Sequence, residues 1–319
     1  MRYSWIDYAK VIALFLVVMG HLVPDADICH KLIYNFHMPF FFFLSGLLHK
    51  EKSISSDIKR LLVPYLLLNV LMLLLETPWI YRKEHSFGFI GEMLSGIIYP
   101  VNTPISYPTW FLLSLLEIKL LVRLTRSMYG KIAMALGCVV FAVFVIPDDL
   151  KLPYFLNESI NAAPYYIIGI ATKSFFLTDI RNGHRKALIN KPLIGGGILL
   201  AHLCLAAILP HIWTDVYHNP GQYLVCLAGV IGAAMIFMCL PNRRISSIEM
   251  ISNGAIAIIG LHPLFIQYLR RGLLLLHFDS AINHIWQWLL YSTIVFLCSV
   301  ITIPIIDKTM PILIGKKRK

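Results

Sequence analysis

Long apolar runs, separated by short polar breaks, follow one another from end to end of the chain. A helix of roughly 20 apolar residues is long enough to cross the hydrocarbon core of a bilayer. The breaks leave no room for a sizeable soluble domain. We therefore predict an all-α integral membrane bundle, residues 1–319, as a single domain of about ten transmembrane helices near residues 9–24, 33–49, 61–81, 109–126, 131–147, 162–178, 192–210, 221–241, 253–276 and 284–307.

The composition supports a membrane protein. Of the 319 residues, 58% are hydrophobic and only 14% are charged, whereas an ordinary soluble domain has about 25% charged residues. The first apolar run contains Asp7, Lys10 and His21, and no cleavage site of small residues follows it. We expect it to be a retained helix and not a removable signal peptide.

The positive charges predict the orientation of the chain. Cytoplasmic loops of membrane proteins are enriched in Lys and Arg. With both termini in the cytoplasm, 21 of the 28 basic residues fall on inner segments, Lys119 falls within a span, and six fall outside: Lys31, Arg82, Lys83, Lys151, Arg270 and Arg271. This bias predicts a multi-pass protein of the cytoplasmic (inner, plasma) membrane. The net charge of +11 comes without a basic stripe interleaved with aromatic residues, so we expect no nucleic-acid partner.

Two further segments carry predictions. The outer loop 82–108 contains a semi-apolar stretch, Phe87 to Tyr99, that is expected to lie along the membrane interface. The tail Gly315–Lys319 is basic and is expected to be a solvated anchor at the lipid headgroups.

The first helix carries a polar stripe. Lys10 and His21 are eleven residues apart, which places them only ~20° apart around a helix and ~16 Å apart along it; Asp7 falls ~40° off the same line. Ionisable groups within a membrane are costly and often functional. Two plainer interpretations stay open: Lys10 as an anchor that reaches the headgroups, and His21 as a hydrogen bond between helices.

Three other residues extend this set. His37 lies about one turn into the second span, at a depth that matches His21, and because no third or fourth ligand is evident we expect no metal site. Arg60, after Lys59, stands at the cytoplasmic start of the third span, where it suits phosphate recognition or simply serves to orient the helix. Glu117 lies inside the fourth span, either facing a pore or pairing with a cation. The other histidines near outer helix ends are expected to be solvated: His202, His211, His218, His277 and His284.

Three motifs resemble a known family, the family 3 membrane acyltransferases, which include polysaccharide and lipid-sugar O-acetylases. The first runs from Ile6-Asp7-Tyr8-Ala9-Lys10 to Val17-Val18-Met19-Gly20-His21, the second is Phe36-His37-Met38-Pro39 to Ser45-Gly46, and the third is Lys59-Arg60-Leu61-Leu62-Val63-Pro64-Tyr65. Trp110-Phe111-Leu112 and Leu261-His262-Pro263-Leu264 are similar to weaker signatures of that family. The distinctive residues lie within the first 65, and the resemblance in span length and order covers the chain.

The resemblance implies transfer of an acetyl group from cytoplasmic acetyl-CoA to a sugar hydroxyl of a surface polysaccharide or lipid-linked glycan. It implies that His21 is catalytic, that Lys10 serves the CoA side, and that Arg60 assists there. Many members have Arg at the Lys10 position, and the pair before the third helix is often Arg-x-Arg, whereas this chain has Ile58 two residues before Arg60. A neutral imidazole in an apolar setting suits a general base, with an acetyl-histidine intermediate as the other route. His37 either helps to orient His21 or the acceptor, or braces the first two helices.

The alternative function is an exporter or flippase for a glycan or organic anion. Against it, the two halves of the sequence show no repeat symmetry and no matching pair of helices broken by Gly or Pro.

Overall fold

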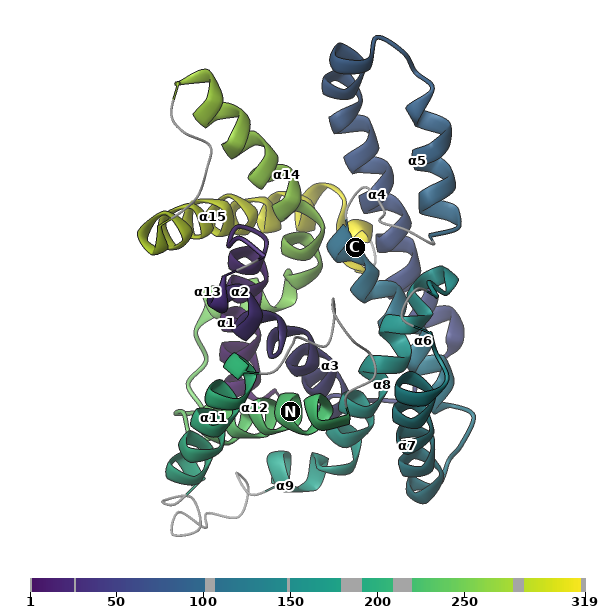
Figure 1. Ribbon diagram of the computed structural model, residues 1–319, viewed down its shortest axis with the longest axis vertical. Coiled ribbons are helices and arrows are strands. Elements are labelled where there is room, and N and C mark those ends of the chain that lie inside the picture. Colours follow the sequence, from purple (N-terminus) through teal and green to yellow (C-terminus); the bar gives the residue numbers. More distant parts are fainter. Residues whose placement is uncertain are drawn as a thin grey trace. The chain divides into compact units, whose positions relative to one another are not determined.

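The computed structural model describes residues 2–25, 27–100, 107–147, 150–178, 191–208, 220–277 and 284–316. All regular structure in these ranges is helical (Figure 1). The elements, in chain order, are α1 (Ser4–Gly20), α2 (Ile28–Tyr34), α3 (His37–Leu47), α4 (Ile54–Glu84), α5 (Phe89–Ile98), η1 (Tyr107–Thr109), α6 (Trp110–Val122), α7 (Met128–Phe144), η2 (Pro153–Phe155), α8 (Leu156–Ala171), α9 (Lys173–Thr178), α11 (Lys191–Ile208), α12 (Pro220–Phe237), α13 (Ser246–Asn253), α14 (Ala255–Leu275), α15 (Ile285–Thr309) and η3 (Pro311–Ile314).

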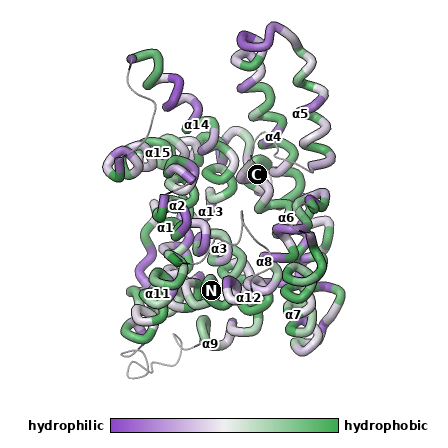
Figure 2. The backbone as a smooth tube through the Cα atoms, in the orientation of Figure 1, coloured by the Kyte–Doolittle hydropathy of each residue, from purple (hydrophilic) through white to green (hydrophobic). Residues whose placement is uncertain are grey.

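Several of these helices have the length and composition of membrane spans. Among the described residues, α4, α11, α12 and α15 are long and apolar enough to cross a bilayer, and α13 with α14 makes a fifth if this pair, bent by 75°, counts as one span. Figure 2 shows hydrophobic residues along most of the helices and hydrophilic residues at the turn between α4 and α5. The all-α class is confirmed for the described ranges. The count of ten spans and the cytoplasmic placement of both termini stay predictions, because helices such as α3 and α6 are shorter than the roughly 20 residues that a span needs.

The helix boundaries differ from the predicted spans in ways that proline and capping explain. The first helix ends at Gly20 and not at residue 24, since Pro24 disfavours helical geometry just before it. The second span is divided at Asn35–Phe36 into α2 and α3. The third begins earlier, at Ile54, where the Ser53 side chain accepts a hydrogen bond from the backbone N–H of Ser56.

The chain forms two compact units, each built from three segments. The first unit comprises Met1–Glu51, Leu121–Leu150 and Ile160–Ser252, and the second comprises Lys52–Leu120, Lys151–Ser159 and Asn253–Lys319. In the first, α1 packs against α2, α3 and α12, and α11 pairs with α12. In the second, α14 packs against α4 and α15, α5 lies beside α4, and η3 packs against all three of α4, α14 and α15 (Figure 1). That one domain spans residues 1–319 stays a prediction.

Two glycines allow α3 and α8 to touch through their backbones. A Cβ atom added at Gly46 would lie 2.0 Å from the carbonyl oxygen of Tyr166, and one at Gly169 would lie 2.3 Å from that of Phe43. Small residues permit such close approach of helices in membrane proteins. The glycine that ends the second sequence motif therefore has a packing role, and it fixes the helix that begins with His37.

Candidate active site

The polar stripe of α1 lies on the packed side of that helix. Lys10 and His21 are both half-buried, whereas Ile12, on the opposite side of the helix, is 50% exposed. Between the two polar residues, the same face carries Leu14 and Val17, which are both buried. The stripe is therefore polar at its ends and aliphatic in its middle.

His21 terminates the helix instead of lying within it. It is the C-terminal capping residue of α1, and its backbone N–H donates to the carbonyl oxygen of Val17. Its Nδ1 atom lies 3.4 Å from the hydroxyl oxygen of Tyr34, and the two rings meet edge to face with centroids 6.2 Å apart. The end of the helix thus holds the imidazole against a phenol from the next helix.

Tyr34, the last residue of α2, has three histidines around it. Its ring stacks on His30 with centroids 4.0 Å apart and meets His37 edge to face at 4.9 Å. We call His21, His30, Tyr34 and His37 the histidine–tyrosine cluster. His30 also lies beside a carboxylate, with Nε2 3.3 Å from Oδ1 of Asp25. Within the described ranges, no three His, Cys, Asp or Glu side chains are placed to hold a metal ion.

His37 bridges the break between α2 and α3. Its Nδ1 donates to the carbonyl oxygen of Ile33 at 2.6 Å, and the side chain is buried. Because a carbonyl can only accept, this contact places the proton of the neutral ring on Nδ1 and leaves Nε2 as the acceptor nitrogen. Both predicted histidines, His21 and His37, therefore reach the same place in the fold, where each contacts Tyr34.

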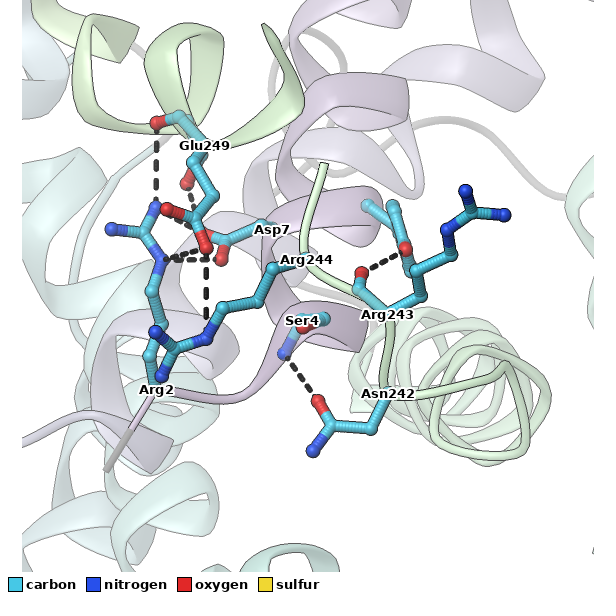
Figure 3. A network of polar contacts seen from close by, with 9 residues as sticks. Arg2, Ser4, Asp7, Asn242, Arg243, Arg244 and Glu249 are labelled. Atoms are coloured by element: carbon cyan, nitrogen blue, oxygen red, sulfur yellow. Dashed lines mark hydrogen bonds and ion pairs between the residues drawn. The ribbon is translucent and has the colours of Figure 1, made fainter. Parts of the chain in front are cut away.

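Asp7 is held in an ion-paired network at the other end of α1 (Figure 3). The Nε and Nη2 atoms of Arg2 donate to its two carboxylate oxygens at 2.7 and 3.0 Å, and the Ser252 hydroxyl donates to Oδ1 at 2.6 Å. The hydrogen bond to Asp7 raises the pKa of Arg2 above its ordinary value. Asp7 is thus satisfied by protein groups, which matches a structural role better than a role in lining a pore.

Further contacts extend this network to the segment before α13. The backbone N–H of Ser4 donates to the Asn242 side chain at 3.2 Å, and the Tyr8 hydroxyl donates to the carbonyl oxygen of Arg243. Glu249 lies 3.7 Å from Arg2 and 3.9 Å from Arg244 (Figure 3). These residues together hold the start of α1 to residues 242–252.

The two predicted cofactor-binding cations belong to different units. Lys10 lies on α1 in the first unit, and Arg60 lies in the first part of α4 in the second, where its side chain is exposed. The buried carboxylate of Asp57, one turn before Arg60, forms an ion pair with Lys119 of α6. This pair neutralises Lys119, so Arg60 and Lys59 provide the exposed charge at this end of α4.

The end of the chain packs against the backbone of Arg60. Leu313 and Ile314 of η3 are buried, and Gly315 has a positive φ of 68°. A Cβ atom at Gly315 would lie 2.7 Å from the carbonyl oxygen of Arg60. Gly315 thus contacts α4 although it is half-exposed, and Lys316 is exposed; the tail as an anchor at the headgroups stays a prediction, and Lys317, Arg318 and Lys319 lie outside the described residues.

Glu117 lies on α6 and accepts a hydrogen bond from the Ser159 hydroxyl. The ion pair that Lys119 of α6 forms is with Asp57; whether Glu117 faces a pore or pairs with a cation stays a prediction. The prediction of solvated outer histidines is wrong for His202, which is fully buried and whose Nδ1 lies 2.8 Å from the carbonyl oxygen of Val225. His211 and His218 lie outside the described residues.

The sequence alone missed Tyr34, His30 and the Asp57–Lys119 pair. Tyr34 did carry a signal, since it lies three residues before His37 and two residues before the start of the second motif. Its contact with His21 joins two helices through a turn at Pro24, and no periodicity reveals such a contact. The sequence separation of 62 residues between Asp57 and Lys119 hides that pair in the same way.

Comparison with known proteins gives one match. A family model described as an acyltransferase domain, that of acyltransferase family 3, matches residues 3–303. The matched range contains every residue of the histidine–tyrosine cluster, as well as Asp7, Lys10, Arg60 and Glu117. No curated protein and no solved structure matches the chain.

Proposed function

The chain belongs to acyltransferase family 3, and from that membership we propose that it transfers an acetyl group from cytoplasmic acetyl-CoA to a hydroxyl of a surface polysaccharide or lipid-linked sugar. The inner membrane is the proposed location, in keeping with the apolar helices and the distribution of basic residues. The observation that carries the proposal is the position of His21, half-buried at the end of α1 with its ring held by Tyr34.

In the proposed reaction, His21 acts as the general base. It takes the proton of the acceptor hydroxyl as that oxygen attacks the thioester carbonyl carbon. The new C–O bond forms, the C–S bond breaks, and the CoA thiolate leaves with the proton that His21 then returns. General bases of this kind contribute about 10²- to 10⁴-fold to a rate. The burial of the residues around His21 supports this role, because an apolar environment favours the neutral imidazole that a base requires.

The donor side of the proposal rests on charge. The phosphates of CoA cannot enter lipid, so they require cations at the membrane surface. Lys10 is proposed for this role because it belongs to the first motif and its side chain is half-buried. Arg60 is proposed because its guanidinium is exposed. The aliphatic face formed by Leu14 and Val17 suits the largely uncharged pantetheine arm and its thioester.

His37 is proposed to assist at the same site. Since its Nδ1 proton is directed to the carbonyl oxygen of Ile33, its Nε2 is left as an acceptor. An acceptor nitrogen next to Tyr34 is suited to orient a hydroxyl group, whether of the substrate or of the protein.

The experiment is a comparison of the purified protein with two variants, using acetyl-CoA as the donor. We expect the wild type to release CoA and to acetylate an added glycan fraction, His21→Ala to lower both by about 10²- to 10⁴-fold, and Lys10→Ala to weaken the use of acetyl-CoA. If neither substitution changes CoA release or acetylation, the enzymatic proposal is wrong. Translocation of a glycan by His21→Ala without acetyl-CoA would instead favour an exporter.

A further inference from the structure

The hydroxyl of Tyr34 lies next to the nitrogen of His21 that is not needed for the proposed chemistry. From this geometry we propose that Tyr34 is a positioning residue for the base: its hydroxyl oxygen accepts a hydrogen bond from Nδ1–H of His21, which leaves the lone pair of the neutral ring on Nε2, the nitrogen that takes the proton. The inference rests on the proposed function.

The role follows from the two nitrogens of an imidazole. A neutral ring has one N–H donor and one acceptor nitrogen, and the partner of one nitrogen decides what the other is able to do. Nδ1 of His21 lies 3.4 Å from the Tyr34 oxygen. With the proton on Nδ1, Nε2 has the lone pair, removes the proton of the acceptor hydroxyl, and later gives that proton to the CoA thiolate. The Nδ1–H bond to Tyr34 persists through both steps, so Tyr34 itself neither gains nor loses a proton.

The orienting contact is long but geometrically supported. At 3.4 Å it exceeds the usual hydrogen-bond length, and catalytic hydrogen bonds often tighten only when substrate is bound. The phenol ring is held on both sides, with His30 stacked on its face and His37 against it edge to face. Gly20 makes room for it, since a Cβ atom there would lie 3.0 Å from Cε2 of Tyr34. The hydroxyl is therefore fixed by packing and not by the contact with His21 alone.

A second histidine–tyrosine pair provides a matched control. Nδ1 of His49 lies 2.7 Å from the hydroxyl of Tyr166, and the two rings meet edge to face at 5.7 Å. This pair joins the segment just after α3 to α8 and has the same chemistry as the His21–Tyr34 contact, yet it contains no residue of the histidine–tyrosine cluster. The substitution of Tyr by Phe removes one hydroxyl in each case and keeps the ring.

The test measures CoA release from acetyl-CoA by wild type, Tyr34→Phe, Tyr166→Phe, His21→Ala and the double variant Tyr34→Phe/His21→Ala. We expect Tyr34→Phe to lower kcat at least about tenfold while KM for acetyl-CoA stays within about twofold. Tyr166→Phe should keep the wild-type kcat. In the His21→Ala background, Tyr34→Phe should have no further effect, because a residue that acts through His21 has nothing left to orient.

Each alternative result is decisive. If the wild type is active and Tyr34→Phe keeps its kcat, the role of Tyr34 is wrong and the proposed function stands. Equal losses in Tyr34→Phe and Tyr166→Phe would show a general packing effect and overturn the inference, as would a further loss when Tyr34→Phe is added to His21→Ala. A wild type that releases no CoA and acetylates no acceptor overturns the proposed function, and the inference falls with it.

Discussion

The two ends of helix α1 hold their ionisable groups in opposite ways. At the first end, Asp7 receives hydrogen bonds from Arg2 and Ser252, so that charge meets charge at distances below 3.1 Å. At the second end, His21 meets the edge of an aromatic ring and a hydroxyl 3.4 Å away. The first arrangement satisfies a carboxylate and leaves it little to offer a substrate. The second orients the imidazole ring through a hydroxyl and an aromatic edge, neither of which carries a charge.

Polar residues that share one stripe of a helix can therefore serve different purposes. Sequence spacing places Asp7, Lys10 and His21 on one side of α1, and by that criterion all three look alike. The contacts separate them: Asp7 fastens the helix to residues 242–252, whereas His21 belongs to the histidine–tyrosine cluster. The two ends should therefore respond differently to substitution, one in activity and the other in stability.

The largest expected effect is on activity, at the His21 end. His21→Ala should lower kcat/KM for acetyl transfer by about 10²- to 10⁴-fold, which corresponds to about 3–5 kcal/mol of transition-state stabilisation. Its unfolding midpoint should stay close to that of the wild type, because the side chain is half-buried at a helix end. Steady-state kinetics and thermal unfolding in the same detergent test both parts. If His21→Ala is equally inactive but largely unfolded, the loss of activity reflects stability, and the proposed difference between the two ends of α1 is wrong.

The next effect is on stability, at the Asp7 end. Asp7→Asn keeps the shape of the side chain but removes the charge that pairs with Arg2. We expect this substitution to lower the free energy of unfolding by about 2–3 kcal/mol. Activity per folded molecule should be retained. Arg244→Ala is the control. The Arg244 side chain is 69% exposed and lies 3.9 Å from Glu249, so we expect its loss to lower the free energy of unfolding by less than about 0.5 kcal/mol. If Asp7→Asn is as stable as this control but inactive, Asp7 belongs to the chemistry and our distinction is wrong.

A smaller effect is expected between the two ends, at Lys10. Lys10→Met keeps the length of the side chain and removes its charge, so the proposed contact with CoA phosphate would be lost. KM for acetyl-CoA should rise about tenfold, equivalent to about 1.4 kcal/mol, with little change in kcat. Lys10→Arg should restore most of the affinity. Unchanged KM in Lys10→Met would assign Lys10 to anchoring at the membrane surface.

The sequence predicted the helical class and the part of the chain that carries the candidate site. Apolar runs report directly on helices in lipid, and the motifs that begin at Ile6 and Phe36 brought His21 and His37 to attention. Both residues contact Tyr34 in the structure. What the sequence could not predict are contacts between distant segments: Arg2 with Asp7 is local, but Ser252 is 245 residues away from Asp7. Periodicity describes one helix at a time and carries no information on such partners.

Helix breaks were the second source of error. The span predicted at 33–49 contains a break at Asn35–Phe36, and it is this break that turns Tyr34 and His37 toward one another. The break carries one polar residue, Asn35, between Tyr34 and Phe36, and a single polar residue beside a long apolar run does not by itself predict that a helix ends. The same holds for Gly20, which looks like an ordinary small residue near a helix end but lies against the ring of Tyr34.

Gly20 offers the finest test of the comparison. A Cβ atom there would lie 3.0 Å from Cε2 of Tyr34 and 3.2 Å from Cγ2 of Ile33, so in Gly20→Ala the phenol must shift by a few tenths of an ångström. We expect kcat to fall about two- to fivefold, which corresponds to a rise of less than about 1 kcal/mol in the activation free energy. Gly137→Ala on α7, where nothing lies within 4 Å, is the matched control and should leave kcat unchanged. Because alanine favours a helix over glycine by up to about 1 kcal/mol, Gly137→Ala should be at least as stable as the wild type, and in Gly20→Ala this gain should offset the small shift of the ring. If Gly20→Ala alone loses activity without losing stability, the position of the Tyr34 ring, and not merely its presence, matters at this end of α1. Equal kcat in the two variants would contradict a role for the position of this ring.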